Sequence, residues 1–482
     1  MALRLPAMFL QPGGQDEEYY AVPGLTILEN GIPRLPHVPA RNAESVFFRG
    51  EECLFAEPPL YFYLQAIFYA MLPGVYGTAR LATAVSACVF LVAMYGIARR
   101  LGLNPRTGLI AVILFSVSRW FFFSAIVARP DMTCAMFGAI AIWLTMVWID
   151  TDARRPFWHL VAIGVCIGLG GLTHMVAITY AIPIGVWILV ASWNRWRWIS
   201  PTIVTLTAIL ISLLWLVLIA QYPDVFSRQF GNQIFHGAGG SIIGRVVWPW
   251  RSLAYHIAML WEHIGPWQCL LAISGVAGIA SRRDRRWLAV VWIIAGTTWF
   301  IAALVGPHHP VYGYWPLPAA LLFVGVGAGV DAIMTHGIDR RSFAGVTKFA
   351  LGTLLAASMI PGSGLRTLVT HVVHRDEMNY DAPRFAAELL RRIPKQGTVA
   401  VDTQFVLDFI VAGRSPLMAE TFPMYFRVDE CPVDYLIVSR HGLQMKIAEF
   451  FETQLMWTDG IRDDPLACYV EVYRVLGPAK HE

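Results

Sequence analysis

The chain has 482 residues, of which 56% are apolar and 15% are charged, and its mean hydropathy is +0.53. Soluble domains carry about 25% charged residues, so this composition excludes a soluble enzyme, a disordered chain and a nucleic-acid-coating protein. The net charge of +4 is small, and long apolar runs alternate with short arginine-rich breaks. The sequence therefore predicts a polytopic α-helical membrane protein.

Ten apolar stretches approach the roughly 20 residues that a membrane-spanning helix needs. They are 81–98, 107–127, 132–149, 158–174, 175–193, 199–220, 256–280, 287–305, 312–332 and 347–361. The breaks on one side carry repeated arginines, such as Arg99 with Arg100 and Arg285 with Arg286. The breaks on the opposite side carry Arg119, Arg129, Arg228, Arg245 and Arg251. Because short loops rich in Lys and Arg stay in the cytoplasm, the arginine-rich side is predicted to be cytoplasmic.

An even number of spans places both ends of the chain on the outer side. The apolar stub at residues 2–10 is too short for a span or a signal peptide, so a first helix is expected ahead of it. Residues 58–72 are apolar but short and tyrosine-rich, and they are predicted to lie in the membrane interface. The predicted domains are an outer first loop with an acidic motif (1–78), a transmembrane bundle (79–361) and an extracytoplasmic α/β domain (362–482).

The outer C-terminal region has the composition of a soluble domain from about residue 376. Helical periodicity predicts a helix over 382–393, and β-type runs predict strands over 398–402, 434–440 and 469–476. This region shows no phosphate loop or nucleophile motif, which favours a packing or acceptor-positioning role. Cys431 and Cys468 are candidates for a disulfide on the oxidising side.

Four polar groups fall on the predicted outer side. They are Asp16 with Glu17, Arg129 with Asp131, His174, and His308 with His309 followed by Tyr314. Carboxylates can deprotonate a hydroxyl or hold a divalent cation, and Arg and His can bind a phosphate. Each group also has a simpler interpretation, as a solvated loop, a helix-end ion pair, a bundle histidine or an interfacial anchor. Their gathering on one face favours a functional site.

The order of these motifs resembles that of a known family. An acidic pair is followed by PPLYFYL at 58–64, TARLATAVSACVFLVAMYGIARRLG at 78–102 and ARPDM at 128–132. The segments 168–189 and 308–323 also match in position. The pattern is similar to that of the GT-C fold membrane glycosyltransferases, in particular glycosyltransferase family 39, the protein O-mannosyltransferase and lipid A aminoarabinose transferase group.

The resemblance implies transfer of a sugar from a polyprenyl-phosphate-sugar donor to a lipid, glycan or protein acceptor at the outer face. By position, Asp16 resembles the catalytic first-loop aspartate with Glu17 as its neighbour, and Asp131 resembles the second acidic position. His174 stands where the family usually has lysine. The pair His308-His309 with Tyr314 stands where the family commonly has Arg-Tyr.

We therefore expect an inverting single displacement with Asp16 as general base. Arg129, His174, His308, His309 and Tyr314 are expected to bind the donor phosphate. A divalent cation such as Mg²⁺ or Mn²⁺ is a further candidate between Asp16 and Asp131. The expected partners are the lipid-linked sugar, membrane lipids and the acceptor, with no nucleic acid.

The expected location is the inner (plasma) membrane of a bacterium, with the site facing outward. Two other classes stay open at this point. One is a transporter of a lipid-linked or anionic substrate, which would place charges deep in the spans. The other is a non-catalytic membrane scaffold, in which Asp16 would lie far from Asp131.

Overall fold

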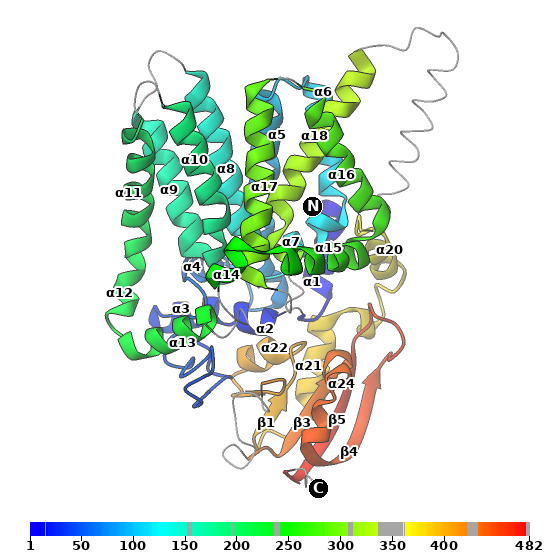
Figure 1. Cartoon of the computed structure of the whole chain (residues 1–482). Helices are drawn as coiled ribbons and strands as arrows, with labels where there is room; N and C mark the ends of the chain where they lie inside the picture. The colour runs from blue at the N-terminus through cyan, green and yellow to red at the C-terminus, as the bar shows by residue number, and fades with distance from the viewer. Residues whose placement is uncertain are drawn as a thin grey trace, which may run out of the picture.

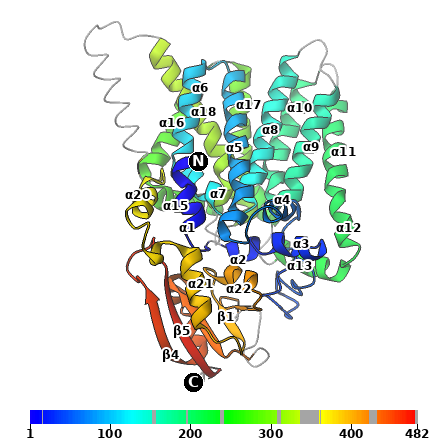
Figure 2. The same ribbon diagram turned by 180° about the vertical axis from the view of Figure 1, so that it is seen from behind.

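The computed structural model describes residues 1–14, 16–151, 157–193, 197–235, 242–282, 284–306, 312–335, 360, 362–421 and 432–478. A bundle of helices forms one end of the molecule and a small sheet domain forms the other (Figures 1 and 2). The short helices α2 (Glu17–Tyr20) and α3 (Pro23–Asn30) lie in the first loop, at the junction of these two parts. The molecule is thus a helical membrane protein with a C-terminal sheet domain, as predicted.

The described part of the bundle contains four helices long and apolar enough to span a membrane, or five if one bent helix pair is a single span. The four are α5 (Tyr76–Arg100), α8 (Asp131–Asp150), α11 continued by α12 (Ile199–Ile219) and α17 (Arg285–Val305). Shorter apolar helices accompany them: α4 (Leu60–Tyr69), α9 (Phe157–Thr173), η2 with α10 (Met175–Ala191), α16 (Pro266–Ala280) and α18 (Pro316–Thr335). Helix α4 lies within the stretch predicted for the membrane interface, and that placement stays a prediction.

The predicted span 107–127 is a bent pair of helices. Helix α6 (Pro105–Ser116) and helix α7 (Arg119–Ile126) meet at an angle of 66°. Between them, Ser118 takes an extended backbone conformation, so the helical hydrogen-bond ladder is interrupted there. An apolar run has the same composition whether its helix is straight or bent, so the composition did not reveal this bend.

The predicted span 256–280 is wrong as a single helix. Helix α15 (Trp250–Ile264) ends at Gly265, and α16 begins at Pro266. Gly265 has a φ of +95°, which favours glycine, and Pro266 provides no backbone N–H to continue the ladder. In Figure 1, α15 lies across the direction of the long helices, whereas α16 runs along them. The predicted span 347–361 lies outside the described residues except for Ile360.

The C-terminal domain contains a five-stranded sheet in the order β2-β1-β3-β5-β4. Its strands are β1 (Val399–Val401), β2 (Leu417–Met418), β3 (Tyr435–Ser439), β4 (Phe451–Gly460) and β5 (Tyr469–Pro478). Strand β1 pairs in parallel with β2 and β3, and β5 pairs antiparallel with β3 and β4. The predicted strands correspond to β1, β3 and β5, which confirms them, and the predicted helix corresponds to α21 (Ala382–Arg392).

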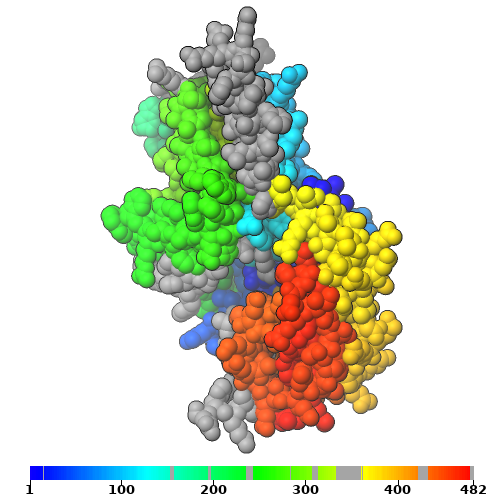
Figure 3. Space-filling view, turned by 90° about the vertical axis from the view of Figure 1, so that its right-hand side faces the viewer, coloured from blue at the N-terminus to red at the C-terminus, as the bar shows by residue number. Residues whose placement is uncertain are grey.

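Strand β4 was not predicted. Its sequence, FETQLMWTDG, is rich in polar residues because β4 is the edge strand and is largely exposed. In the space-filling view, the orange and red strands form one block with the yellow segment that precedes them (Figure 3). Phe385 and Leu389 of α21 are buried in the same cluster of side chains as the strands β1 and β3.

Hydrogen bonds fasten the sheet domain to the first loop. The backbone N–H of Gly13 donates to the carbonyl of Gln404 at 3.1 Å, and the N–H of Met418 donates to the carbonyl of His37 at 2.9 Å. Glu420 is partly buried nearby and accepts hydrogen bonds from the N–H and hydroxyl of Thr403, both at 2.7 Å. The first loop and the sheet domain therefore share one buried interface.

This interface should make the stability of the protein depend on pH. Burial, together with the charge of Asp402, raises the pKa of Glu420 to about 8, whereas an unfolded glutamate titrates near 4.3. Between these values the folded state binds the extra proton, so stability should fall as pH rises from about 4.5 to about 8.

The variant Glu420→Gln keeps an acceptor for Thr403 without the charge. The free energy of unfolding of this variant should lack a pH-dependent change on the order of a few kcal/mol that wild type shows between about pH 4.5 and about pH 8. The variant should therefore melt at a higher temperature than wild type at pH 8.5. Thermal unfolding of the solubilised protein across pH 5–9 checks this expectation. An unchanged slope in the variant would contradict it.

Candidate functional site

A guanidinium bridges two of the predicted carboxylates. Arg129 pairs through Nη1 with Oδ2 of Asp16 and through Nε with Oδ2 of Asp131, the latter at 2.7 Å. The Asp131 side chain is 2% exposed and that of Arg129 is 14% exposed, whereas that of Asp16 is 53% exposed. Burial alone would lower the pKa of Arg129, but Asp131, Tyr20 and Asp16 outweigh it and hold that pKa well above its ordinary value. The structure thus brings together the predicted site residues Asp16, Arg129 and Asp131. Of the two carboxylates, that of Asp16 is open to solvent.

Local backbone geometry explains these positions. Asp16 has a φ of +66° in a tight turn ahead of α2, a conformation in which aspartate is among the better tolerated residues. Asp131 is the first residue of α8 and follows Pro130, so its charge lies at the positive end of that helix. Each of these two carboxylates therefore belongs to a residue at the start of a helix, where the backbone fixes its position.

His174 lies between two buried carboxylates. Its Nε2 is 3.6 Å from Oε1 of Glu57 and 3.8 Å from Oδ1 of Asp131. Its Nδ1 accepts the backbone N–H of Val176 at 3.1 Å, which caps η2. Because Nδ1 accepts a hydrogen bond, the ring proton is on Nε2 and points toward the carboxylates. His174 therefore presents an N–H toward Glu57 and Asp131 that lies beyond hydrogen-bond distance of both carboxylates.

Glu57 was not among the residues predicted for the site. Its side chain is buried, and burial raises its pKa above the ordinary value. Tyr20 donates from its hydroxyl to Oε1 of Glu57 at 3.4 Å. Within the described residues, Oε2 of Glu57 and Oδ1 of Asp131 accept no hydrogen bond. In the sequence, Glu57 directly precedes the apolar stretch 58–72, and a carboxylate at such a membrane boundary is a signal that could have marked it as a candidate.

Tyr314 belongs to the same cluster. Its ring lies edge-on to the His174 ring with 5.1 Å between ring centres. The preceding residue, Gly313, passes so close to Asp131 that an added Cβ would lie 3.0 Å from its Oδ2. The structure therefore places Tyr314 with Asp131 and His174, whereas His308 and His309 lie outside the described residues.

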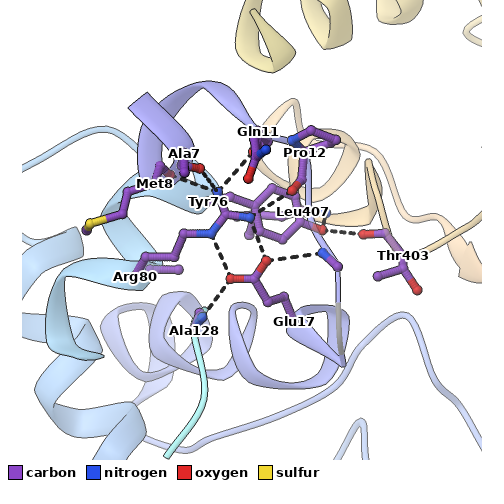
Figure 4. Close-up of polar contacts among 12 residues, drawn as sticks. Ala7, Met8, Gln11, Pro12, Glu17, Tyr76, Arg80, Ala128, Thr403 and Leu407 are labelled. Carbon is purple, nitrogen blue, oxygen red and sulfur yellow. Dashed lines mark hydrogen bonds and ion pairs between the residues drawn. The ribbon is translucent and has the colours of Figure 1, made fainter. Parts of the chain in front are cut away.

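Glu17 binds Arg80 of α5, through the contacts drawn in Figure 4. Its two oxygens accept from Nε and Nη2 of Arg80 at 2.8 and 2.6 Å. They also accept the backbone N–H groups of Ala128 at 2.6 Å and Gly14 at 3.1 Å. With 1% of its side chain exposed, Glu17 positions Asp16 on one side and the Arg129 loop on the other.

Arg80 is the centre of this network. Beyond Glu17, it donates to backbone carbonyls of the N-terminal segment: Ala7 (3.3 Å), Met8 (2.8 Å), Gln11 (2.9 Å) and Pro12 (2.7 Å). Its guanidinium also lies 5.6 Å from the ring centre of Tyr76, whose hydroxyl donates to the carbonyl of Thr403 at 2.7 Å. One side chain thus joins the N-terminal segment, the first loop and the sheet domain.

Arg80 was not predicted, although the sequence carries a signal for it. It lies near the start of the apolar helix α5, whose other arginines are at its C-terminal end, and cations in a membrane span are rare and usually functional. The predicted span began at residue 81, which left Arg80 one residue outside it.

Comparison with known proteins agrees with this fold. A family model described as dolichyl-phosphate-mannose-protein mannosyltransferase matches residues 56–220. An undecaprenyl phosphate-α-4-amino-4-deoxy-L-arabinose arabinosyl transferase from Pseudomonas fluorescens is 27% identical over 302 residues, which cover 60% of this chain and 52% of the relative. The chain thus spans about half the length of this curated relative.

Two solved structures are similar in fold. ArnT from Cupriavidus metallidurans, bound to undecaprenyl phosphate, has a TM-score of 0.65 at 16% identity, covering 100% of this chain and 97% of that one. The oligosaccharyltransferase of Archaeoglobus fulgidus has a TM-score of 0.54 at 14% identity, covering 97% and 69%.

The fold and the matched segment define the class of protein. The chain is an integral membrane protein that shares the GT-C fold with ArnT, and its residues 56–220 match the protein mannosyltransferase family model. The resemblance predicted from the motif order is thereby confirmed.

Proposed function

We propose that the chain is a glycosyltransferase that moves a sugar from a polyprenyl-phosphate donor to an acceptor at the outer face of the membrane. The matched family model, the P. fluorescens relative and the ArnT fold support a lipid-linked donor. The carboxylates of the site gather on the side of the bundle that carries the sheet domain, which agrees with the outer placement from the arginine distribution.

The observation that carries the mechanism is the exposed carboxylate of Asp16 fixed against Arg129. One oxygen of Asp16 is paired with the guanidinium, which leaves the other to accept a proton from an acceptor hydroxyl or amine. The acceptor atom bonds to the anomeric carbon as the carbon–oxygen bond to phosphate breaks, and the electron pair leaves with the phosphate. A single displacement of this kind inverts the anomeric configuration.

The leaving phosphate gains negative charge, which nearby donors would stabilise. Arg129 supplies a fixed cation, and His174 supplies an N–H between Glu57 and Asp131. The burial of these groups strengthens such interactions because water is largely excluded around them. Tyr314 contributes the edge of the same pocket.

The residues at the site do not form a cage for a divalent cation. The guanidinium of Arg129 stands between Asp16 and Asp131, where such an ion was expected. In the described part of the chain, no group of three or more His, Cys, Asp or Glu side chains is arranged to hold a metal. No step of the proposed mechanism therefore passes through a metal.

Chelation should consequently have little effect on transfer. We expect the rate in excess EDTA to stay within about twofold of the untreated rate, since the guanidinium supplies the charge at that point. Rates with and without EDTA, followed by addition of Mg²⁺ or Mn²⁺, test this. A loss that either metal restores would contradict the expectation.

Release of labelled sugar from a panel of polyprenyl-phosphate-sugars tests the proposed function. Membranes containing the wild-type chain are compared with membranes containing the Asp16→Asn variant. Label that leaves the lipid only with wild-type chain would support a lipid-linked glycosyltransferase. Failure of well-folded chain to release any of the sugars would overturn the proposal in favour of a transporter or scaffold.

Asp131→Asn should act mainly on the donor. The substitution removes one of the two carboxylates that orient Arg129, so the apparent KM for the donor should rise about tenfold with a smaller change in kcat. Steady-state kinetics against donor concentration measure the two parameters. An unchanged KM would mean that Asp131 only stabilises the start of α8.

A further inference from the structure

A chain of hydrogen bonds joins α4 to the backbone of Arg129. Nε2 of Gln65 donates to the hydroxyl of Tyr61 at 3.4 Å, and the Tyr61 hydroxyl lies 2.8 Å from the hydroxyl of Thr83 on α5. The Thr83 hydroxyl in turn donates to the carbonyl of Arg129 at 3.2 Å. The side chains of Gln65, Tyr61 and Thr83 are all fully buried. None of these three residues was predicted from the sequence as part of the site.

The protons of this chain all point the same way. A threonine hydroxyl carries a single proton, and Thr83 donates its proton to the Arg129 carbonyl, so the bond between Thr83 and Tyr61 uses the proton of Tyr61. The Tyr61 oxygen then accepts from Gln65, whose amide nitrogen has two N–H donors. The chain therefore begins at Gln65 and ends at the backbone of Arg129.

The carbonyl of Ala79 explains why Thr83 donates outside its own helix. A threonine inside a helix can donate to the carbonyl four residues before it, which for Thr83 is that of Ala79. That carbonyl already accepts from Nε2 of Gln65 at 3.1 Å, in addition to the backbone N–H of Thr83 within α5. About one turn further along α5, Ser86 does donate to the carbonyl four residues before it, at 2.8 Å. Gln65 thus occupies the local acceptor and directs the Thr83 hydroxyl outward.

The first loop holds Gln65 in this position. Helices α3 and α4 lie side by side (Figure 2), and a Cβ added to Gly24 of α3 would lie 2.8 Å from the Cβ of Gln65. One turn further along α4, the hydroxyl of Tyr69 donates to the carbonyl of Ala21, which follows α2, at 2.9 Å. The hydrogen-bond chain therefore links the first loop, through α4, to the segment that carries Arg129.

The position of the Arg129 side chain depends on its backbone. Its guanidinium bridges the two site carboxylates, and the residues 127–130 that carry it lie between α7 and α8 and belong to neither helix. Glu17 accepts the N–H of Ala128 at 2.6 Å, and the Arg129 carbonyl accepts from Thr83 at 3.2 Å. Loss of the second bond would let the guanidinium shift, and a shift of about 1 Å at an active site can cost up to about a hundredfold in rate.

We propose that Tyr61 is a positioning residue for sugar transfer, which acts through Thr83 on the backbone of Arg129. The inference rests on the proposed function and adds α4 to the elements that build the site. Because the hydroxyls of Tyr61 and Thr83 are fully buried, they act on the donor only through Arg129. Their effect is to fix its guanidinium before the donor phosphate binds.

The variant Tyr61→Phe tests the proposal by removing one hydroxyl from the middle of the chain. The apparent KM for the donor should rise about fivefold, which corresponds to about 1 kcal/mol, with a smaller change in kcat. The reason is that Arg129 keeps its charge but is held less firmly. Tyr63→Phe is the matched control on the same helix. The Tyr63 hydroxyl donates to the carbonyl of Gly31 at 2.9 Å and takes no part in the chain, so this variant should show the wild-type KM.

Variants of Thr83 separate positioning from stability. Thr83→Ser keeps the hydroxyl and should retain the wild-type KM. Thr83→Val leaves the Tyr61 hydroxyl buried without its acceptor, so it should lower the melting temperature as well as raise the KM. Combining Thr83→Val with Tyr61→Phe removes both polar groups. In this double variant the melting temperature should recover in part, whereas the KM should stay raised about fivefold.

Recovery of the KM together with the melting temperature in the double variant would overturn the proposal, because the two hydroxyls would then contribute to stability alone. A wild-type KM in Tyr61→Phe would overturn it as well. Either result, obtained with wild-type chain that transfers sugar, would leave the proposed function standing. Absence of transfer by well-folded wild-type chain with every donor would instead overturn the proposed function, and this inference with it.

Discussion

Replacing Asp16 by asparagine is expected to reduce sugar transfer by about 10²–10⁴-fold, the usual contribution of a general base. The substitution removes the charge and little else. Asparagine has the same size, it tolerates the positive φ of this turn, and its amide oxygen still accepts from Arg129. The melting temperature should therefore stay close to that of wild type, and initial rates of label release measure the loss.

Asp224→Asn is the matched control for this experiment. Asp224 is an exposed carboxylate in the first turn of α13 (Pro223–Phe235) and takes no part in the site. We expect it to retain wild-type transfer. Activity of Asp16→Asn within a few-fold of wild type would rule out Asp16 as the base.

The fold was largely predictable because apolar runs of helical length have few stable arrangements in a membrane. That signal reports where a helix exists but says little about its direction. The turn at Gly265 and Pro266 and the bend at Ser118 both interrupt sequences that remain apolar throughout. Strand β4 was missed for the opposite reason, since an edge strand exposed to water carries few apolar residues.

The candidate site was predictable where charges lie in loops beside apolar runs. Asp16, Arg129 and Asp131 were identified in this way, and the structure brings them into contact. Glu17 is adjacent to Asp16 in the sequence, but its carboxylate pairs with Arg80. Only the tertiary structure shows which of the two carboxylates belongs to the site. Glu57 joins His174 only through the folding of the first loop, which local sequence does not encode.

Arg80→Met is expected to destabilise the protein by about 3–5 kcal/mol and to abolish most of its transfer. The substitution leaves the carboxylate of Glu17 buried without its cation, and breaking a buried pair in this way carries a cost of that size. It also removes the donor for the carbonyls of Met8, Gln11 and Pro12, so the segment before Asp16 loses its attachment. Thermal unfolding and label release measure the two effects.

A second variant separates stability from positioning. Adding Glu17→Met to Arg80→Met removes the unpaired charge, and replacing a whole buried ion pair by apolar residues is often nearly neutral. The double variant should therefore regain part of the lost melting temperature. It should not regain transfer, because the N–H groups of Ala128 and Gly14 then have no carboxylate between them to hold Asp16 opposite Arg129. If transfer returned together with stability, Arg80 and Glu17 would be structural only, and the position of Asp16 would be set by its own turn and by Arg129.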